Sequence, residues 1–155
     1  MQKSNFDLND NIEKHLIEYG WYAERKIDIK SVIETWKADN YRVFDSAIFF
    51  VQSFNELNIV HEAYRGKEKD SSYFNSIKST KGIDPAWIFE EYSLKAGNDL
   101  LPIGLGYSEH LTYFIDSSYR FYGGYDDYFC YIGDSVNSFF NNLFYEKKLY
   151  HVVIK

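Results

Sequence analysis

Hydrophobic residues recur at helical spacing through the first third of the chain. The pattern predicts a helix over residues 10–19, a second that begins after Asp28, and a third that begins near Asp45. In the second segment the apolar positions fall at i, i+3, i+4 and i+7, which places them on one face of a helix. Asp28 is also a residue type that is preferred at helix N-caps. The N-terminal third is therefore expected to be helical, with one apolar stripe buried per helix.

The period changes in the middle of the chain. Residues 58–64 are partly β-branched and predict a strand, whereas the charged residues 66–70 are typical of a loop. Asp84 and Pro85 form a strong helix start, because Asp caps the first turn and Pro fits the first helical position. We expect that helix to continue until Gly97, a residue type that ends helices.

From residue 100 onward the pattern is that of a β meander. Strands are predicted at 100–103, 111–116, 119–123 and 128–132, with turns at 117–118 and 124–127. Pro102 favours a strand end or a sheet edge, because proline cannot donate to a strand ladder.

The strongest amphipathic pattern of the chain follows Asp134, which is expected to cap a last helix. Residues 149–154 could add a final short strand. Helices, then strands, then a helix predict an α+β fold with a mainly antiparallel or mixed β-sheet and helices packed around it. The chain has no internal repeat, no low-complexity tract and no evident domain boundary, so residues 1–155 are expected to form a single domain.

Charge and cysteine content exclude several classes of protein. The formal net charge of −6 disfavours binding to nucleic acid or to an anionic membrane. A single cysteine, Cys130, excludes an internal disulfide and a Cys-rich zinc site. The N-terminus lacks an apolar run behind a basic start, and the densest apolar stretch, 47–51, is too short for a membrane span. A cytoplasmic protein is expected.

Motifs for catalysis or cofactor binding are weak. The four histidines are far apart in the sequence, and no spacing typical of a metal site occurs. Cys130 lies in the most apolar strand and is expected to be inert. The pair Gly104 and Gly106 is an incomplete phosphate-loop motif. We therefore expect no enzyme activity, no cofactor and no metal.

Acidic and tyrosine residues concentrate in the last third of the chain. Residues 96–146 contain one base, Arg120, against seven acids. The chain also contains 15 Tyr, and each buried tyrosine hydroxyl needs a partner, so several tyrosines of this segment are expected at the surface. Exposed tyrosine mixed with acid suits a protein-binding face. The candidate contact residues are Glu109, Asp116, Asp126, Asp127, Tyr107 and Tyr125.

Each of these signals has an alternative explanation. The aromatic excess could equally reflect AT-rich coding, which also favours Asn, Ile and Lys. Asp126 and Asp127 could serve only their predicted turn, because Asp is common in turns. His110 beside Glu109 leaves open a small enzyme or ligand-binding protein that uses a cleft between helices and sheet.

Several short motifs, in order, resemble the third subgroup of the SUKH immunity-protein superfamily. They are Gly20-Trp21-Tyr22, Arg25 to Asp28, Leu101 to Gly104, Leu111 to Asp116, Arg120 to Gly123, and Ile132 to Ser135 before Phe139-Phe140. The chain departs from the family pattern at Asn55-Glu56, where a glycine pair is frequent, and at Tyr119, where glycine is common. Both departures affect turn geometry.

The resemblance implies a SUKH/Knr4-like α+β fold and an immunity protein that neutralises the toxin domain of a bacterial polymorphic toxin. Such a domain is often a nuclease, and catalysis and a cofactor are not expected of the inhibitor. A nuclease is usually basic where it grips phosphate, so an acidic inhibitor would be steered to that face. A general protein-interaction module remains an alternative, and the oligomeric state stays open.

Overall fold

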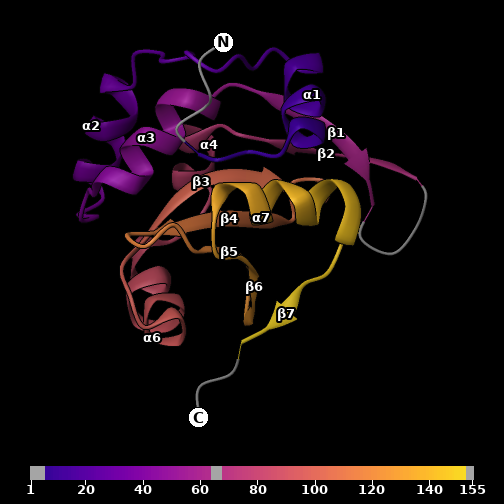
Figure 1. Cartoon of the computed structure of the whole chain (residues 1–155). Helices are drawn as coiled ribbons and strands as arrows, with labels where there is room; N and C mark the ends of the chain where they lie inside the picture. Colours follow the sequence, from indigo (N-terminus) through magenta and orange to yellow (C-terminus); the bar gives the residue numbers. More distant parts are fainter. Residues whose placement is uncertain (1–5, 64–67, 153–155) are drawn as a thin grey trace.

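A computed structural model describes residues 6–63 and 68–152 of the chain, and its centre is one antiparallel β-sheet (Figure 1). The order of the strands in the sheet is their order in the sequence, and each strand pairs antiparallel with the next. The strands are β1 (Asn58–Glu62), β2 (Lys69–Tyr73), β3 (Leu100–Gly106), β4 (Leu111–Asp116), β5 (Phe121–Tyr125), β6 (Tyr128–Gly133) and β7 (Tyr150–His151). From β3 to β6 this arrangement is the meander that the sequence predicts, and the whole sheet is antiparallel.

Helices cover both faces of the sheet. In the view of Figure 1, the N-terminal helices lie above the sheet and α6 lies below it. The helices are α1 (Asp10–Glu18), α2 (Lys30–Ala38), α3 (Asp45–Phe54), α4 (Ser76–Lys81), α5 (Pro85–Trp87), α6 (Ser93–Ala96) and α7 (Val136–Asn141), with π-helical turns η1 (Ile88–Tyr92) and η2 (Asn142–Glu146). The α+β fold class is therefore confirmed. Within the described residues, no helix is both long and apolar enough to cross a membrane.

Aromatic rings fill the core between the upper helices and the sheet. Phe50 of α3 lies 5.3 Å from Phe121 of β5, and Phe121 stacks on Phe139 of α7 at 4.4 Å between ring centroids. All three side chains are fully buried. Burial of one such side chain stabilises the fold by about 1.5–3 kcal/mol, so this cluster holds α3 and α7 against the sheet.

A second aromatic cluster lies on the opposite face of the sheet. Tyr92 of η1 stacks on Phe129 of β6 at 4.7 Å and meets Phe114 of β4 edge-on at 5.6 Å. The Tyr92 hydroxyl donates a hydrogen bond of 2.5 Å to the carbonyl of Asp126, in the turn between β5 and β6. Tyr92 thereby attaches the α5–η1–α6 segment to both a strand and a turn.

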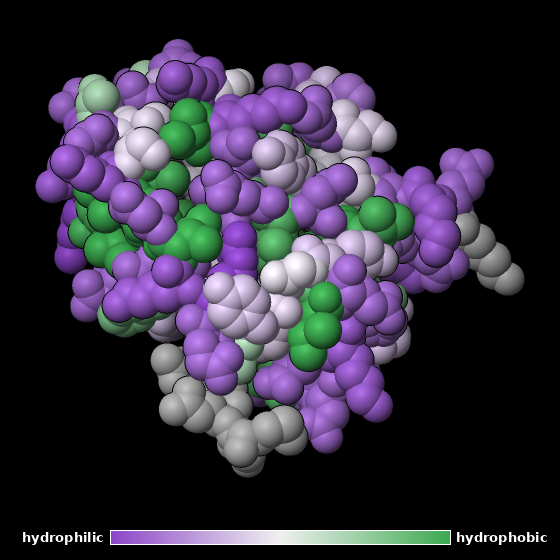
Figure 2. Space-filling view, turned by 90° about the horizontal axis from the view of Figure 1, so that it is seen from above, coloured by the Kyte–Doolittle hydropathy of each residue, from purple (hydrophilic) through white to green (hydrophobic). Residues whose placement is uncertain are grey.

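Seen from above, the surface over the N-terminal helices carries hydrophobic side chains between polar ones, mainly on the left side of the view (Figure 2). This part of the chain has several exposed hydrophobic residues: Ile17 of α1, Tyr22 in the loop after α1, and Phe49 of α3. This mixed surface is distinct from the acidic surface described below, which lies at the α4–α5 side of the sheet.

Most elements predicted from the sequence are confirmed. The first three helices, the four meander strands and the helix after Asp84 occur within a few residues of their expected bounds. Gly97 ends α6 with a left-handed φ of 71°. The last helix is capped by Ser135 instead of Asp134, because the Ser135 side chain accepts from the backbone N–H of Ser138 while Ser138 bonds back.

The structure differs from the sequence predictions at several places around the sheet. The loop predicted at 66–70 ends too late, because strand β2 already begins at Lys69. Helix α4 has no counterpart among the elements predicted from the sequence. Residues 64–67 lie outside the described residues, and so do residues 153–155 of the expected final strand, which is otherwise reduced to β7. Pro102 lies inside β3 and not at the strand end, but the alternative of a sheet edge is confirmed. β2 pairs only with Leu105 and Gly106, so β3 is an edge strand at Pro102, and a bulge follows the proline.

A buried chain of hydrogen bonds connects β1, β2 and β4. Nε2 of His61 lies 2.7 Å from the Ser72 hydroxyl, which lies 2.7 Å from the Tyr113 hydroxyl. Because Nδ1 of His61 lies 2.9 Å from the carbonyl of Glu62, Nδ1 must carry the proton, and Nε2 of the neutral ring accepts from Ser72. Burial lowers the pKa of His61, against smaller raising effects of its bond to Glu62 and of Asp70.

This arrangement predicts a loss of stability in mild acid. The folded pKa of His61 lies below the ordinary value of 6.5, so the unfolded state binds more protons as the pH falls. The contribution of neutral His61 to the free energy of unfolding is therefore complete above pH 6.5, and it is lost as the pH falls toward the lower folded pKa. We expect His61→Gln to flatten the dependence of unfolding free energy on pH between about 7 and 5. Exposed His151→Gln is the control, and equal slopes for both variants in urea unfolding would contradict the assignment.

Candidate functional site

A groove lies between the α4–α5 segment and the turns at one end of the sheet. Its volume is about 770 Å³, within the usual range for binding sites. We call it the acidic groove. It is lined by Lys78, Gly82, Ile83, Asp84, Trp87, Tyr92, Leu105, Glu109, His110, Thr112, Gly124, Tyr125, Asp126 and Asp127.

Strands form the floor of the acidic groove. Leu105 of β3, Thr112 of β4 and Gly124 of β5 lie side by side, since Thr112 pairs with both of the others. A side chain at position 124 would collide with the ring of Tyr92. The glycine therefore allows the tyrosine to lie against the sheet, and the position of Tyr92 sets one side of the groove.

Helix starts form one wall. The Asp84 side chain accepts from the backbone N–H of Ala86 at 3.0 Å, and Pro85 occupies the first helical position, as the sequence predicts. This cap places Trp87 at the rim, where its indole Nε1–H donates to the carbonyl of Asp126 at 3.0 Å. The wall and the β5–β6 turn are thus bonded directly.

The β5–β6 turn presents two free carboxylates. Asp126 has a left-handed φ of 49°, a conformation that Asp tolerates better than most residues. Its backbone carbonyl, not its carboxylate, receives the bonds from Trp87 and Tyr92. The side chains of Asp126 and Asp127 are exposed and form no hydrogen bond or ion pair with any residue that the structure describes.

The β3–β4 turn forms the other end of the groove. Tyr107, Ser108 and Glu109 have left-handed φ values of 52°, 60° and 66°. The N–H of Ser108 donates to the Asp70 carboxylate at 3.2 Å, which ties this turn to β2. Glu109 forms an ion pair with Lys78 across the groove. Lys78 is therefore already paired with an acid.

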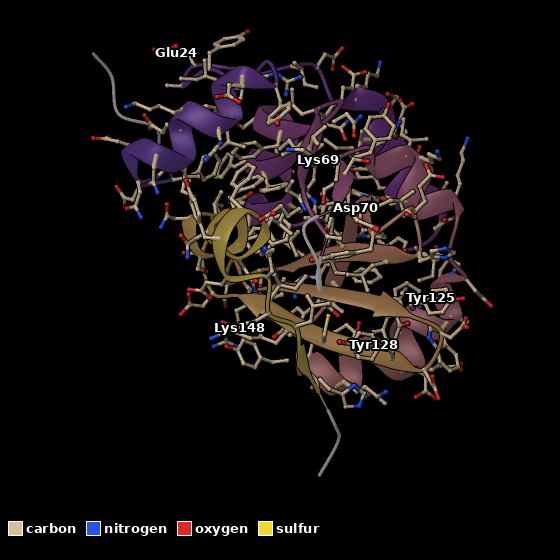
Figure 3. The ribbon with its side chains drawn as sticks, turned by 90° about the vertical axis from the view of Figure 1, so that its right-hand side faces the viewer. Glu24, Lys69, Asp70, Tyr125, Tyr128 and Lys148 are labelled. Carbon is tan, nitrogen blue, oxygen red and sulfur yellow. The ribbon has the colours of Figure 1, made fainter. Side chains whose placement is uncertain are left out.

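The acidic groove is electrostatically negative and has an aromatic rim. Four carboxylates line it, from Asp84, Glu109, Asp126 and Asp127, against the single ammonium group of Lys78. Trp87 is 37% exposed and Tyr125 is 49% exposed. Figure 3 shows Tyr125 at the end of one strand, with Tyr128 on the strand that returns beside it. Such a surface suits a cationic protein segment, since aromatic faces and carboxylates both attract cations.

Four of the six residues singled out from the sequence meet at this groove. Glu109, Tyr125, Asp126 and Asp127 line it, although they come from two separate turns. Tyr107 is half-buried outside the groove, with its ring 6.0 Å from that of His61. Sequence reasoning therefore gathered most of the groove's acids.

Asp116 is placed elsewhere, inside the molecule. It is fully buried, and its Oδ1 accepts from the backbone N–H groups of Ser118 at 2.8 Å and Arg120 at 3.0 Å. The Ser46 hydroxyl donates to its carbonyl at 2.6 Å. This carboxylate stabilises the β4–β5 turn and offers no surface to a partner, so we remove Asp116 from the contact set.

The tyrosines divide between core and surface. Tyr113 is fully buried and Tyr122 is 5% exposed, whereas Tyr125 is open to solvent. The expectation that several tyrosines of this segment reach the surface is therefore only partly met. Tyr113 and Ser72 show how a buried hydroxyl is satisfied within the core.

Trp87 and Thr112 are groove residues that the sequence reasoning missed. Trp87 could have been found, because the capped start at Asp84 places the next turn at the surface. Thr112 could not, since a threonine inside an apolar strand carries no distinguishing signal.

Catalytic groups are poorly supported by the geometry. His110 lies beside Tyr125, with ring centroids 5.8 Å apart, and its neighbour Glu109 is paired with Lys78. Burial raises the pKa of Cys130 to about 12, so its thiol is not a nucleophile at neutral pH. Among the described residues, no group of three or more potential ligands could hold a metal ion.

Comparison with known proteins identifies one family. A family model described as SUKH-3 immunity protein matches residues 8–146, which is nearly the whole chain. Searches of curated proteins and of solved structures each gave no significant match.

The close approach of Tyr92 to the sheet predicts a sensitive position. Gly124→Ala should lower the free energy of unfolding by about 1–3 kcal/mol, because the added methyl must displace a buried ring. Gly82→Ala, at an exposed position of the same groove with ordinary helical φ, is the control and should change little. Urea unfolding of both variants measures the difference, and equal effects would show that Tyr92 does not depend on Gly124.

Proposed function

The chain belongs to the SUKH-3 immunity protein family, and on that premise we propose that it binds and neutralises the toxin domain of a cognate bacterial polymorphic toxin. The proposal needs only direct protein–protein contact, with no cofactor and no reaction by the inhibitor itself. A cytoplasmic location would place the inhibitor where such a toxin acts. The family match is the observation that carries this function.

The acidic groove is the proposed toxin contact. The carboxylates of Asp126 and Asp127 are exposed and form no ion pair with any residue that the structure describes, and the exposed ring of Tyr125 adjoins them. Glu109 contributes if the partner competes with Lys78 for its carboxylate. Tyr107, at the base of the same turn as Glu109, supports this end of the contact surface.

The charge of the groove favours a basic toxin domain, and a nuclease is the class we propose. A nuclease that grips phosphate presents cationic side chains, and an acidic inhibitor is steered toward them. The whole chain, at −6, adds to this long-range attraction. The inhibitor would then cover the phosphate-binding surface or the region beside it.

Co-expression tests the function directly. A toxin domain encoded with this chain should kill or arrest cells when it is expressed alone and should be harmless when the chain is present. Purified chain should also inhibit the toxin's activity at a one-to-one ratio. Persistent toxicity with a folded, expressed chain would refute the proposal.

Reversing the charge of the β5–β6 turn should weaken toxin binding. Asp126→Asn with Asp127→Lys keeps a residue that tolerates left-handed φ at position 126 and changes the charge by three units. The dissociation constant should rise by more than about tenfold, since close charge pairs across interfaces couple by about 1.5 kcal/mol or more.

The matched control carries the same change in charge at positions that do not line the acidic groove. Glu18→Gln with Glu34→Lys changes exposed residues of α1 and α2. Calorimetric titration of both double variants into the toxin domain separates a local contact from the effect of net charge. Equal weakening by the two variants would remove the β5–β6 turn from the contact.

Salt should slow association. Attraction between an acidic groove and a basic domain is screened within about 8–10 Å at physiological ionic strength, so the association rate should fall as salt rises while dissociation changes less. Stopped-flow mixing at low and moderate salt measures both rates. A salt-independent association rate would indicate an apolar interface, such as the surface near Phe49.

A further inference from the structure

Thr112 occupies an unusual position on the floor of the acidic groove. The residue is only 8% exposed, and its hydroxyl forms no hydrogen bond with any part of the chain that the structure describes. The hydroxyl oxygen is not among the buried atoms that lack a partner, so it is open to the groove, where water can bond it in the free protein. A polar group that enters the groove can replace that water with a direct hydrogen bond to Thr112.

The rest of the groove indicates the chemistry of that group. The carboxylates of Asp126 and Asp127 are unpaired, and that of Asp84 lies on the opposite wall. Trp87 and Tyr125 present exposed rings at the rim. A group that satisfies all of these must be cationic, must have several hydrogen-bond donors and must have a flat face.

A guanidinium group has all three properties. It is always charged, it presents its N–H donors in a planar fork that matches carboxylates, and it stacks on aromatic rings. An ammonium group lacks the flat face, and a neutral side chain leaves the acids unpaired. The hydroxyl of Thr112 can accept a hydrogen bond from the end of such a side chain.

We propose that the acidic groove binds an arginine side chain that projects from the toxin domain, with the Thr112 hydroxyl at the bottom of the groove and Trp87 and Tyr125 at its rim. This inference rests on the proposed function for the identity of the partner. The volume of about 770 Å³ also accommodates the residues that flank the arginine, so the partner segment is a loop that enters the groove.

A small probe tests the groove without the toxin. The peptide N-acetyl-Gly-Arg-Gly-amide is titrated into the full chain, with methyl-labelled Thr, Leu and Ile, and followed by NMR. The methyl resonances of Thr112, Leu105 and Ile83 should shift in a saturable manner. The matched peptide carries citrulline, which keeps the shape of arginine but is neutral. It should bind at least about tenfold more weakly, because hydrogen bonds between charged groups are stronger than those between neutral groups.

Two variants locate the interaction. Thr112→Val keeps the shape of the side chain and removes the hydroxyl, and Asp126→Asn removes a charge at an exposed position that does not hold the fold together. Each should weaken binding of the arginine peptide by about three- to tenfold. Thr35→Val on α2, at a position that does not line the groove, is the control and should bind normally.

The outcomes separate the two proposals. Equal binding of the arginine and citrulline peptides, shifts confined to other surfaces, or unchanged binding by both groove variants would overturn this inference, even if the chain protects cells from its toxin. If the arginine peptide binds in the groove but the chain protects against no toxin, the proposed function fails and the arginine site stands. A lysine peptide that binds as tightly as the arginine peptide would overturn the choice of guanidinium.

Discussion

The attachment of the α5–η1–α6 segment to the sheet depends on Tyr92. Its ring stacks on Phe129, and its hydroxyl bonds the carbonyl of Asp126, so one side chain fixes both a layer of the fold and a turn at the surface. The same contact requires glycine at position 124, because any side chain there would meet the ring. The acidic groove is therefore a consequence of how the second layer is anchored, and its shape is as stable as that anchor.

Two-sided burial explains much of the aromatic content. A sheet with helices on both faces needs apolar side chains in both directions along each strand, as Tyr113 and Phe114 of β4 show, one for each face. The aromatic excess is thus largely a property of the core. The exposed ring of Tyr125 at the end of β5 is not part of that core, and it lies beside the exposed acids of the groove.

Sequence patterns predict the long elements of this fold and most of the groove's acids, because periodicity, caps and turns are local properties. They miss β2, since Lys-Asp-Ser-Ser-Tyr carries no apolar alternation and becomes a strand only through pairing with β1 and β3. They also misplace Asp116, whose burial depends on the turn that closes over it. Glu56 and Tyr119 depart from the family's glycines, yet they adopt left-handed φ values of 74° and 62°. At these two positions the fold therefore holds a larger residue in the backbone region that glycine favours.

The β5–β6 turn has a consequence for how this protein can evolve. The backbone carbonyl of Asp126 is bonded by Trp87 and Tyr92, while the exposed carboxylates of Asp126 and Asp127 form no hydrogen bond or ion pair with any residue that the structure describes. Mutation can therefore alter the chemistry of the exposed surface without an accompanying penalty in the core, within the limit that position 126 must tolerate a left-handed backbone. The exposed surface of the turn can therefore change one substitution at a time, while the scaffold beneath it remains under separate selection.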